Sequence, residues 1–175
     1  MVVWLDLANA YGSIPHQLIY TSLQHYHIDR HIQKIITSYL DIIKLRFSVG
    51  DQMTNWQKLE KGIVTRCTVS VVLFIMGMNL LINSAKRETR GPETQSGIYL
   101  PSSTGFIDDL ILTTSSHIQA RWMLKALTDV ATWTRMKFKP AKSRSFVIKK
   151  GKTTVRFKLH IQNEEIASIV KGPIK

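Results

Sequence analysis

Two adjacent aspartates lie in the middle of an apolar, β-branched run, GFIDDLIL, at residues 105–112. Carboxylates are normally kept in water, so their place in such a run needs a structural reason. A tight turn between two short strands, residues 104–107 and 110–114, supplies that reason because it exposes Asp108 and Asp109 at its tip. The pattern therefore predicts a β-hairpin, and its acidic tip is either a functional site or a solvated turn.

A third aspartate ends another apolar run. The segment VVWLD at residues 2–6 predicts a strand that ends on Asp6 and leads into a helix. If Asp6 lies beside Asp108 and Asp109, the three carboxylates repel one another unless cations bind between them. Mg²⁺ suits such oxygen ligands, and two ions roughly 3.5–4 Å apart drive in-line phosphoryl transfer. The three aspartates are therefore candidate ligands for divalent ions.

The charge of the chain is strongly basic, with a formal net charge of +12 and a pI near 10.0. Such a charge points to a polyanionic partner, either nucleic acid or an anionic membrane surface. Every charged residue between Asp129 and Glu164 is Lys or Arg, so this block can follow a phosphate backbone, or it is a solvated basic face. The block consists of Arg135, Lys137, Lys139, Lys142, Arg144, Lys149, Lys150, Lys152, Arg156 and Lys158.

Length and composition indicate one globular domain or part of one, with 175 residues of which 44% are hydrophobic. The single cysteine, Cys67, allows neither an intrachain disulfide nor a cysteine-based zinc site, which fits a reducing compartment. The longest apolar run, residues 69–78, is too short to span a bilayer, and the N-terminus lacks the pattern of a signal peptide. We therefore expect an intracellular protein, nuclear or cytoplasmic, with no membrane partner.

Apolar spacing predicts several helices. The segment 68–87 is apolar nearly all round, which is typical of a buried helix. The predicted helices are residues 15–26, a helix capped by Asp29, residues 68–87, and a helix capped by Ser116 and Gln119 that runs to about Met136. The second of these carries a stripe expected in the core, made of Ile32, Ile35, Ile36, Tyr39, Leu40 and Ile43; the last carries Ile118, Trp122, Leu127 and Val130 on one side.

Two further hairpins complete the predicted elements. Residues 46–49 and 54–59 flank Gly50 and Asp51, and residues 145–150 and 153–161 are joined through Gly151 and Lys152. Strands and helices alternate with mixed connections. The expected fold class is therefore α+β, an antiparallel sheet with helices packed on one face.

Taken in order, these segments resemble the palm of a reverse transcriptase, most similar to those of non-LTR (LINE-type) retrotransposons. Residues 2–16, VVWLDLANAYGSIPH, resemble the family's first catalytic motif, which implies that Asp6 is a metal ligand. By the same resemblance, Tyr11 lies under the incoming sugar and rejects a ribose 2′-hydroxyl; without it, Tyr11 reads as a core aromatic at a helix start. Gly12 stands where many relatives carry Asp.

The segment GIVTRCTVSVVLF at residues 62–74 is similar to the family's second motif, a glycine-bearing turn that leads into a long buried helix supporting template and nucleotide. The resemblance implies nucleotide-binding positions at Gly62 and Arg66. The family usually has a second glycine where this chain has Arg66, because glycine lets the backbone approach the nascent base pair closely. Arg66 places a long cationic side chain there instead.

Two later motifs carry the remaining resemblance. FIDD at residues 106–109 resembles the family's Asp-Asp box, which implies that Asp108 is a metal ligand and that Asp109 lies beside the metals. MKFKPAKS at residues 136–143 resembles the next motif, whose lysine protonates the leaving pyrophosphate or neutralises its charge. We assign that role to Lys142. Lys139 stands where an asparagine is commoner.

The resemblance implies an RNA-directed DNA polymerase that uses two Mg²⁺ ions, or Mn²⁺ in their place, to join a dNTP to a primer 3′-hydroxyl. Its partners are an RNA template, a DNA primer and dNTP. Residues 1–175 then form a palm fragment, with catalytic motifs in 1–150 and a C-terminal hairpin in 151–175 that leads toward the thumb. The resemblance places the fingers and thumb outside this chain, on the same polyprotein.

Two other hypotheses remain open at the level of sequence. The chain is an inactive retrotransposon remnant that at most binds nucleic acid through its basic surface, or His25, His27 and His31 bind zinc. A solvated connection between two helices explains those histidines without a metal.

Overall fold

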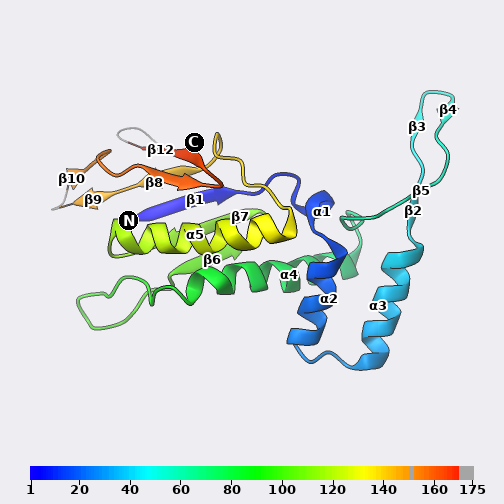
Figure 1. Ribbon diagram of the computed structural model, residues 1–175, viewed down its shortest axis with the longest axis horizontal. Helices are drawn as coiled ribbons and strands as arrows, with labels where there is room; N and C mark the ends of the chain where they lie inside the picture. The colour runs from blue at the N-terminus through cyan, green and yellow to red at the C-terminus, as the bar shows by residue number, and fades with distance from the viewer. Residues whose placement is uncertain (150–151, 170–175) are drawn as a thin grey trace. The chain divides into compact units, whose positions relative to one another are not determined.

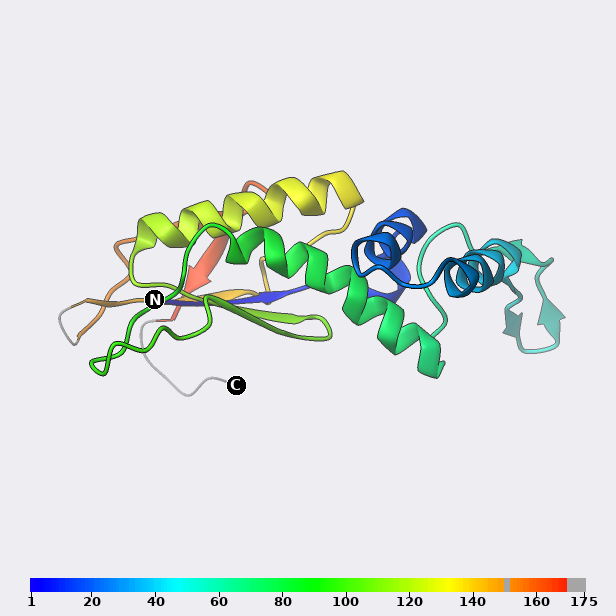
Figure 2. The same cartoon turned by 90° about the horizontal axis from the view of Figure 1, so that it is seen from below.

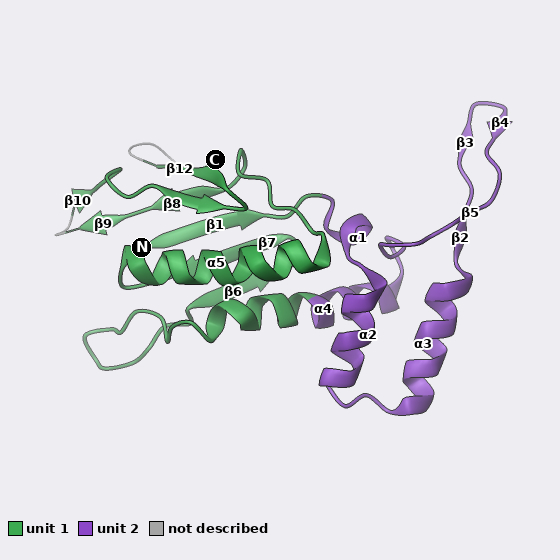
Figure 3. Cartoon of the chain, in the orientation of Figure 1, with its two compact units in different colours: residues 1–8, 78–175 green, residues 9–77 purple. Residues whose placement is uncertain are grey.

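The computed structural model describes residues 1–149 and 152–169, and the chain divides into two compact units (Figure 3). Unit 1 consists of Met1–Ala8 and Met78–Lys175, and unit 2 of Asn9–Gly77. Each unit has its own buried residues, and the helix of residues 68–86 is divided between them. The candidate carboxylates all belong to unit 1, whereas Tyr11, Gly62 and Arg66 belong to unit 2.

Unit 1 is built on a six-stranded sheet with the order β11-β12-β8-β1-β7-β6 (Figure 1). Its neighbouring strands are antiparallel except for β12 and β8, which run parallel. The strands of the unit are β1 Val2–Asp6, β6 Ser103–Phe106, β7 Asp109–Thr113, β8 Arg144–Phe146, β9 Ile148–Lys149, β10 Lys152–Thr153, β11 Leu159–Ile161 and β12 Glu164–Ser168.

Helices cover one face of this sheet. Figure 2 shows α5, His117–Thr134, and the unit 1 part of α4, which is Thr68–Lys86 in full, on the same side of the strands. In β1 the buried positions alternate, so Val3 and Leu5 belong to the core while Asp6 lies on the opposite face. The predicted fold class, an α+β sheet with helices packed on one face, is confirmed.

Helix α5 begins where the sequence predicts. The Ser116 hydroxyl accepts a hydrogen bond from the Gln119 N–H at 3.3 Å, and the Gln119 side chain accepts one from the Ser115 N–H at 3.1 Å. The predicted grouping of Ile118, Trp122 and Leu127 on one side is wrong, because Ile118 and Trp122 are exposed whereas Leu127 is buried. The buried face consists of Ala120, Met123, Leu124, Leu127, Ala131 and Thr134.

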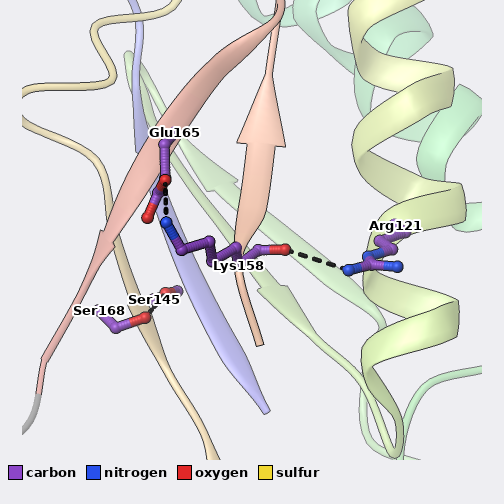
Figure 4. A network of polar contacts seen from close by, with 5 residues as sticks. All are labelled: Arg121, Ser145, Lys158, Glu165 and Ser168. Atoms are coloured by element: carbon purple, nitrogen blue, oxygen red, sulfur yellow. Dashed lines mark hydrogen bonds and ion pairs between the residues drawn. The ribbon is translucent and has the colours of Figure 1, made fainter. Parts of the chain in front are cut away.

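Strand β12 is absent from the predicted elements. It follows β11 through Gln162 and Asn163, both at positive φ, as a two-residue type I′ hairpin turn requires. Two polar contacts of Lys158, the residue before β11, stabilise this region (Figure 4). Its Nζ lies 3.0 Å from Glu165 Oε2 of β12, and its carbonyl accepts a hydrogen bond from Arg121 of α5 at 3.4 Å. A hydrogen bond of 3.0 Å between the hydroxyls of Ser145 and Ser168 joins β12 to β8. Gly151, in the predicted turn before β11, lies outside the described residues.

Unit 2 contains helices and two short antiparallel ribbons, β2 with β5 and β3 with β4. The ribbon of β3 and β4 turns at Gly50 and Asp51, as predicted. Its elements are α1 Ala10–Ser13, α2 His16–His25, α3 Arg30–Ile42, β2 Lys44–Leu45, β3 Ser48–Val49, β4 Gln52–Met53, β5 Gln57–Lys58 and the first half of α4.

The apolar stripe on α3 is not core, contrary to the sequence prediction. Asp29 caps the helix as predicted and accepts a hydrogen bond from the His31 N–H at 2.7 Å. Of the stripe, Leu40 alone is fully buried within the described structure, whereas Ile32 and Ile35 are exposed. Helical spacing predicts which residues share a face, but not whether another element covers that face.

Helix α4 is less buried than its composition predicts. Leu73 and Phe74 are buried, but Val69, Val72 and Ile75 on the other side of its first turns are exposed. Among the described residues it is the one helix long and apolar enough to cross a membrane, a test that the core helix of a soluble protein also passes.

Candidate active site

Asp6 and Asp109 face each other across two paired strands. The antiparallel register of β1 and β7 places Asp6 opposite Asp109, between the buried core residues Leu5 and Leu7. Side chains directly opposite in such a pair start about 4.5–5.5 Å apart at Cβ and project on the same face. The two carboxylates therefore share the sheet face that the helices leave open.

Asp108 lies in the turn between β6 and β7. Because Phe106 pairs with Asp109, the two central turn residues are Ile107 and Asp108, one position earlier than the predicted tip. Ile107 has a φ of +53°, a conformation that costs a β-branched residue energy. The Leu7 N–H donates to the Asp108 carbonyl at 3.1 Å, so the turn is tied to the end of β1.

A third segment, residues 137–139, pairs with the chain just after Asp6. The Lys139 N–H donates to the Asp6 carbonyl at 2.7 Å, and the Ala8 N–H donates to the Lys137 carbonyl at 2.8 Å. The fully buried Ser143 hydroxyl accepts from the Asp6 N–H at 3.3 Å and donates to the Lys139 carbonyl at 2.9 Å. These bonds hold the Asp6 backbone independently of its carboxylate.

The Asp6 carboxylate has an unsatisfied oxygen. Its Oδ1 is buried and accepts no hydrogen bond, and the Nζ of Lys139 lies 3.4 Å from it. A buried anionic oxygen without donors is suited to a cation, so Asp6 and Asp109 fit the first ligands of a divalent ion. Across residues 1–149 and 152–169, however, no three His, Cys, Asp or Glu side chains are grouped to hold a metal.

The same result bears on the zinc hypothesis. His25, His27 and His31 form no metal-binding group in the described part of the chain. His27 adopts a positive φ of 52° in the connection between α2 and α3. The structure therefore gives the zinc hypothesis no support.

Basic side chains lie beside the carboxylates. A surface pocket on the open face is lined by Asp6 and Asp109 together with Trp4, Lys142 and Arg144. The structure thus brings the predicted Lys142 to the same pocket as two predicted aspartates. Sequence reasoning gave Arg144 no individual role. Its place in the pocket follows from the pairing of β8 with β1, which sets Arg144 opposite Trp4.

In unit 2, the backbone at Gly62 packs closely against the backbone of Gly12. Its N–H donates to the Ile14 carbonyl at 2.8 Å, and the following N–H of Ile63 donates to the Tyr11 carbonyl at 2.9 Å. Its φ is +82°, and a Cβ added there would lie 2.8 Å from the Gly12 carbonyl oxygen. Glycine is therefore required at this position both by conformation and by space.

Tyr11 and Arg66 lie near the same loop in unit 2. The Tyr11 ring stacks on Phe74 with centroids 4.6 Å apart, so it is at least a packed aromatic at a helix start. Arg66 has a φ of +63°, the left-handed conformation that glycine adopts at lower cost. The backbone at Arg66 is thus the one that the family's usual second glycine favours.

Cys67 follows Arg66 and precedes α4. The backbone N–H and hydroxyl of Ser70 and the backbone N–H of Val69 lower the pKa of the Cys67 thiol, because donor groups beside the sulfur favour the thiolate. Burial and the contact with this thiol raise the pKa of Tyr39, whose hydroxyl lies 3.9 Å from the sulfur. Both pKa shifts arise from groups of the chain near the start of α4, and neither requires a bound ligand.

The comparison with protein families agrees with this arrangement. Residues 1–165 match the family model described as reverse transcriptase (RNA-dependent DNA polymerase). The chain therefore belongs to the reverse transcriptase family. No curated protein sequence matches it significantly.

Proposed function

We propose that this chain is the palm region of an RNA-directed DNA polymerase of the non-LTR (LINE-type) class. The observation that carries the proposal is the pairing of Asp6 with Asp109 at one end of β1 and β7, beside the turn that holds Asp108. Family membership supports the polymerase activity, and the order and spacing of the four motifs support the non-LTR class.

In this proposal Asp6 and Asp109, together with Asp108 of the adjoining turn, would hold two Mg²⁺ ions, for which Mn²⁺ can substitute. Ions held there would supply neutralisation of phosphate charge and activation of the primer 3′-hydroxyl toward the α-phosphorus of the dNTP. The chain's own residues position the reactants, since no covalent protein intermediate is needed. Lys142, in the pocket with Asp6, would neutralise or protonate the leaving pyrophosphate.

The resemblance also assigns roles in unit 2. Tyr11 would select against a ribose 2′-hydroxyl, and Gly62 and Arg66 would line the nucleotide. The basic block is exposed at eight described positions, which supports contacts with an RNA template and a DNA primer. These positions are Arg135, Lys137, Lys142, Arg144, Lys149, Lys152, Arg156 and Lys158.

A second candidate function is nucleic-acid binding without catalysis. Two observations favour it: Arg66 occupies a backbone conformation suited to glycine, and an ammonium lies at the buried oxygen of Asp6. Such a remnant would bind RNA or DNA with a steep dependence on salt and no dependence on Mg²⁺.

Primer extension distinguishes the two functions. Because the proposal places fingers and thumb outside these 175 residues, the segment is expressed with its natural flanking sequence. With a DNA primer on an RNA template, dNTP incorporation is expected in Mg²⁺ and not in EDTA. Binding of the primed template without any incorporation in Mg²⁺ or Mn²⁺ would instead support the remnant.

A further inference from the structure

We propose that Lys139 is a built-in competitor for the divalent ion at Asp6. Its ammonium occupies part of the cation position at the buried oxygen, and a metal ion has to displace it. The inference rests on the proposed function, in which Asp6 is a metal ligand. It adds a residue that sets how tightly the ion binds.

The backbone fixes Lys139 next to Asp6. The Lys139 N–H donates to the Asp6 carbonyl at 2.7 Å, and the buried hydroxyl of Ser143 bridges the two residues through the Asp6 N–H and the Lys139 carbonyl. One position earlier, Phe138 forms a β-bridge with Leu7. The nearness of the two side chains therefore follows from strand-like pairing and not from a chance rotamer.

The contact between the side chains is one of charge. Lys139 Nζ lies 3.4 Å from Asp6 Oδ1, yet that oxygen accepts no hydrogen bond and is buried. A buried carboxylate oxygen without a donor is costly unless a cation lies near it. The ammonium supplies that cation but donates no hydrogen bond to the oxygen. The lone pairs of the oxygen are therefore available to a metal ion that replaces the ammonium.

The Lys139 side chain can also move away from the Asp6 carboxylate. Its side chain is 39% exposed, whereas that of Asp6 is 19% exposed, so the flexible lysine reaches water with little rearrangement. A Mg²⁺ ion bound directly to Asp6 needs oxygen ligands at about 2.0–2.1 Å and repels an ammonium at the same oxygen. The two cations are therefore mutually exclusive at Oδ1, and pairing with Lys139 reduces the apparent metal affinity.

The test is Mn²⁺ binding to the purified chain, followed by the electron paramagnetic resonance of free Mn²⁺. Lys139→Asn and Lys139→Gln both remove the ammonium and are expected to bind Mn²⁺ about tenfold more tightly than wild type, because a unit charge near the ion is removed. Lys137→Asn is the matched control. It makes the same charge change on an exposed side chain two residues away, and its contact with Ala8 uses a backbone carbonyl that asparagine keeps.

An Asp6→Asn variant separates the possible failures. Tighter binding in both Lys139 variants, unchanged binding in Lys137→Asn and loss of this binding on Asp6→Asn would support the inference. If wild type binds Mn²⁺ through Asp6 but the Lys139 variants match Lys137→Asn, the competition is wrong while the metal site stands. If no variant binds Mn²⁺ in a way that depends on Asp6, the inference and the proposed metal site both fail.

Discussion

An Asp6→Asn variant is expected to lose RNA-templated primer extension by roughly 10³-fold, because a catalytic metal ion contributes several kcal/mol to the transition state. The fold should survive the change. The bonds that hold Asp6 to Lys139 and Ser143 use its backbone carbonyl and N–H, which asparagine keeps. Steady-state incorporation of a single dNTP, with the flanking sequence present, measures the loss.

Asp129→Asn is the matched control for this prediction. Asp129 is an exposed residue of α5 in the same unit, and its replacement makes the same change in net charge. Extension by Asp129→Asn should equal that of wild type. Comparable extension by Asp6→Asn and wild type would remove Asp6 from the active site, whatever the family membership of the chain.

A Gly62→Ala variant is expected to lower the free energy of unfolding of the chain by roughly 2–4 kcal/mol, the sum of a left-handed backbone penalty and overpacking. The added methyl group would meet the backbone of Gly12 at 2.8 Å from its carbonyl oxygen and 2.9 Å from its Cα. A backbone neighbour cannot rotate away as a side chain does. The Ile14 and Tyr11 hydrogen bonds of this loop would be disturbed with it.

Gly50→Ala separates conformation from crowding. Gly50 also has a positive φ, +59°, but no heavy atom lies within 4 Å of an added Cβ. This control should cost about 1–2 kcal/mol, the backbone penalty alone. Urea unfolding of the two variants gives the comparison, and equal losses would mean that the close approach of Gly62 to Gly12 is not a constraint.

Local pattern was sufficient for the elements that carry the carboxylates. The run ending on Asp6 predicts β1 with its observed bounds, and the paired aspartates predict the hairpin of β6 and β7 within one residue. A carboxylate that ends or interrupts an apolar run is a local signal, so Asp6 and Asp109 can be recognised before any pairing is known.

Tertiary context decided the rest. The α3 stripe has helical spacing, yet Ile32 and Ile35 are exposed because the described structure places nothing over them. Strand β12 has a single buried apolar residue, Ile166, and depends on pairing with β8 and β11. Its one local signal is the turn residue Asn163, which tolerates positive φ.

The candidate site likewise has some features that local sequence indicates and others that depend on tertiary context. Sequence motifs indicate Asp6 and Lys142, which line one pocket. They do not indicate that Ser143 bridges Asp6 and Lys139, because that contact joins β1 to a segment more than a hundred residues later. Nor do they predict that an ammonium lies at the buried Asp6 oxygen, which depends on strand pairing after β1.

The most direct test of the account is the affinity for dTTP of the chain with its flanking sequence, bound to a poly(rA) template whose primer ends in a dideoxynucleotide and cannot be extended, measured by equilibrium dialysis in Mg²⁺ and in EDTA. If Asp6 and its neighbours hold ions for nucleotidyl transfer, binding should be at least about tenfold tighter in Mg²⁺, since the ions neutralise the triphosphate. Asp6→Asn should remove most of that difference. Equal dTTP affinity in Mg²⁺ and EDTA would contradict the account and leave a basic nucleic-acid-binding module.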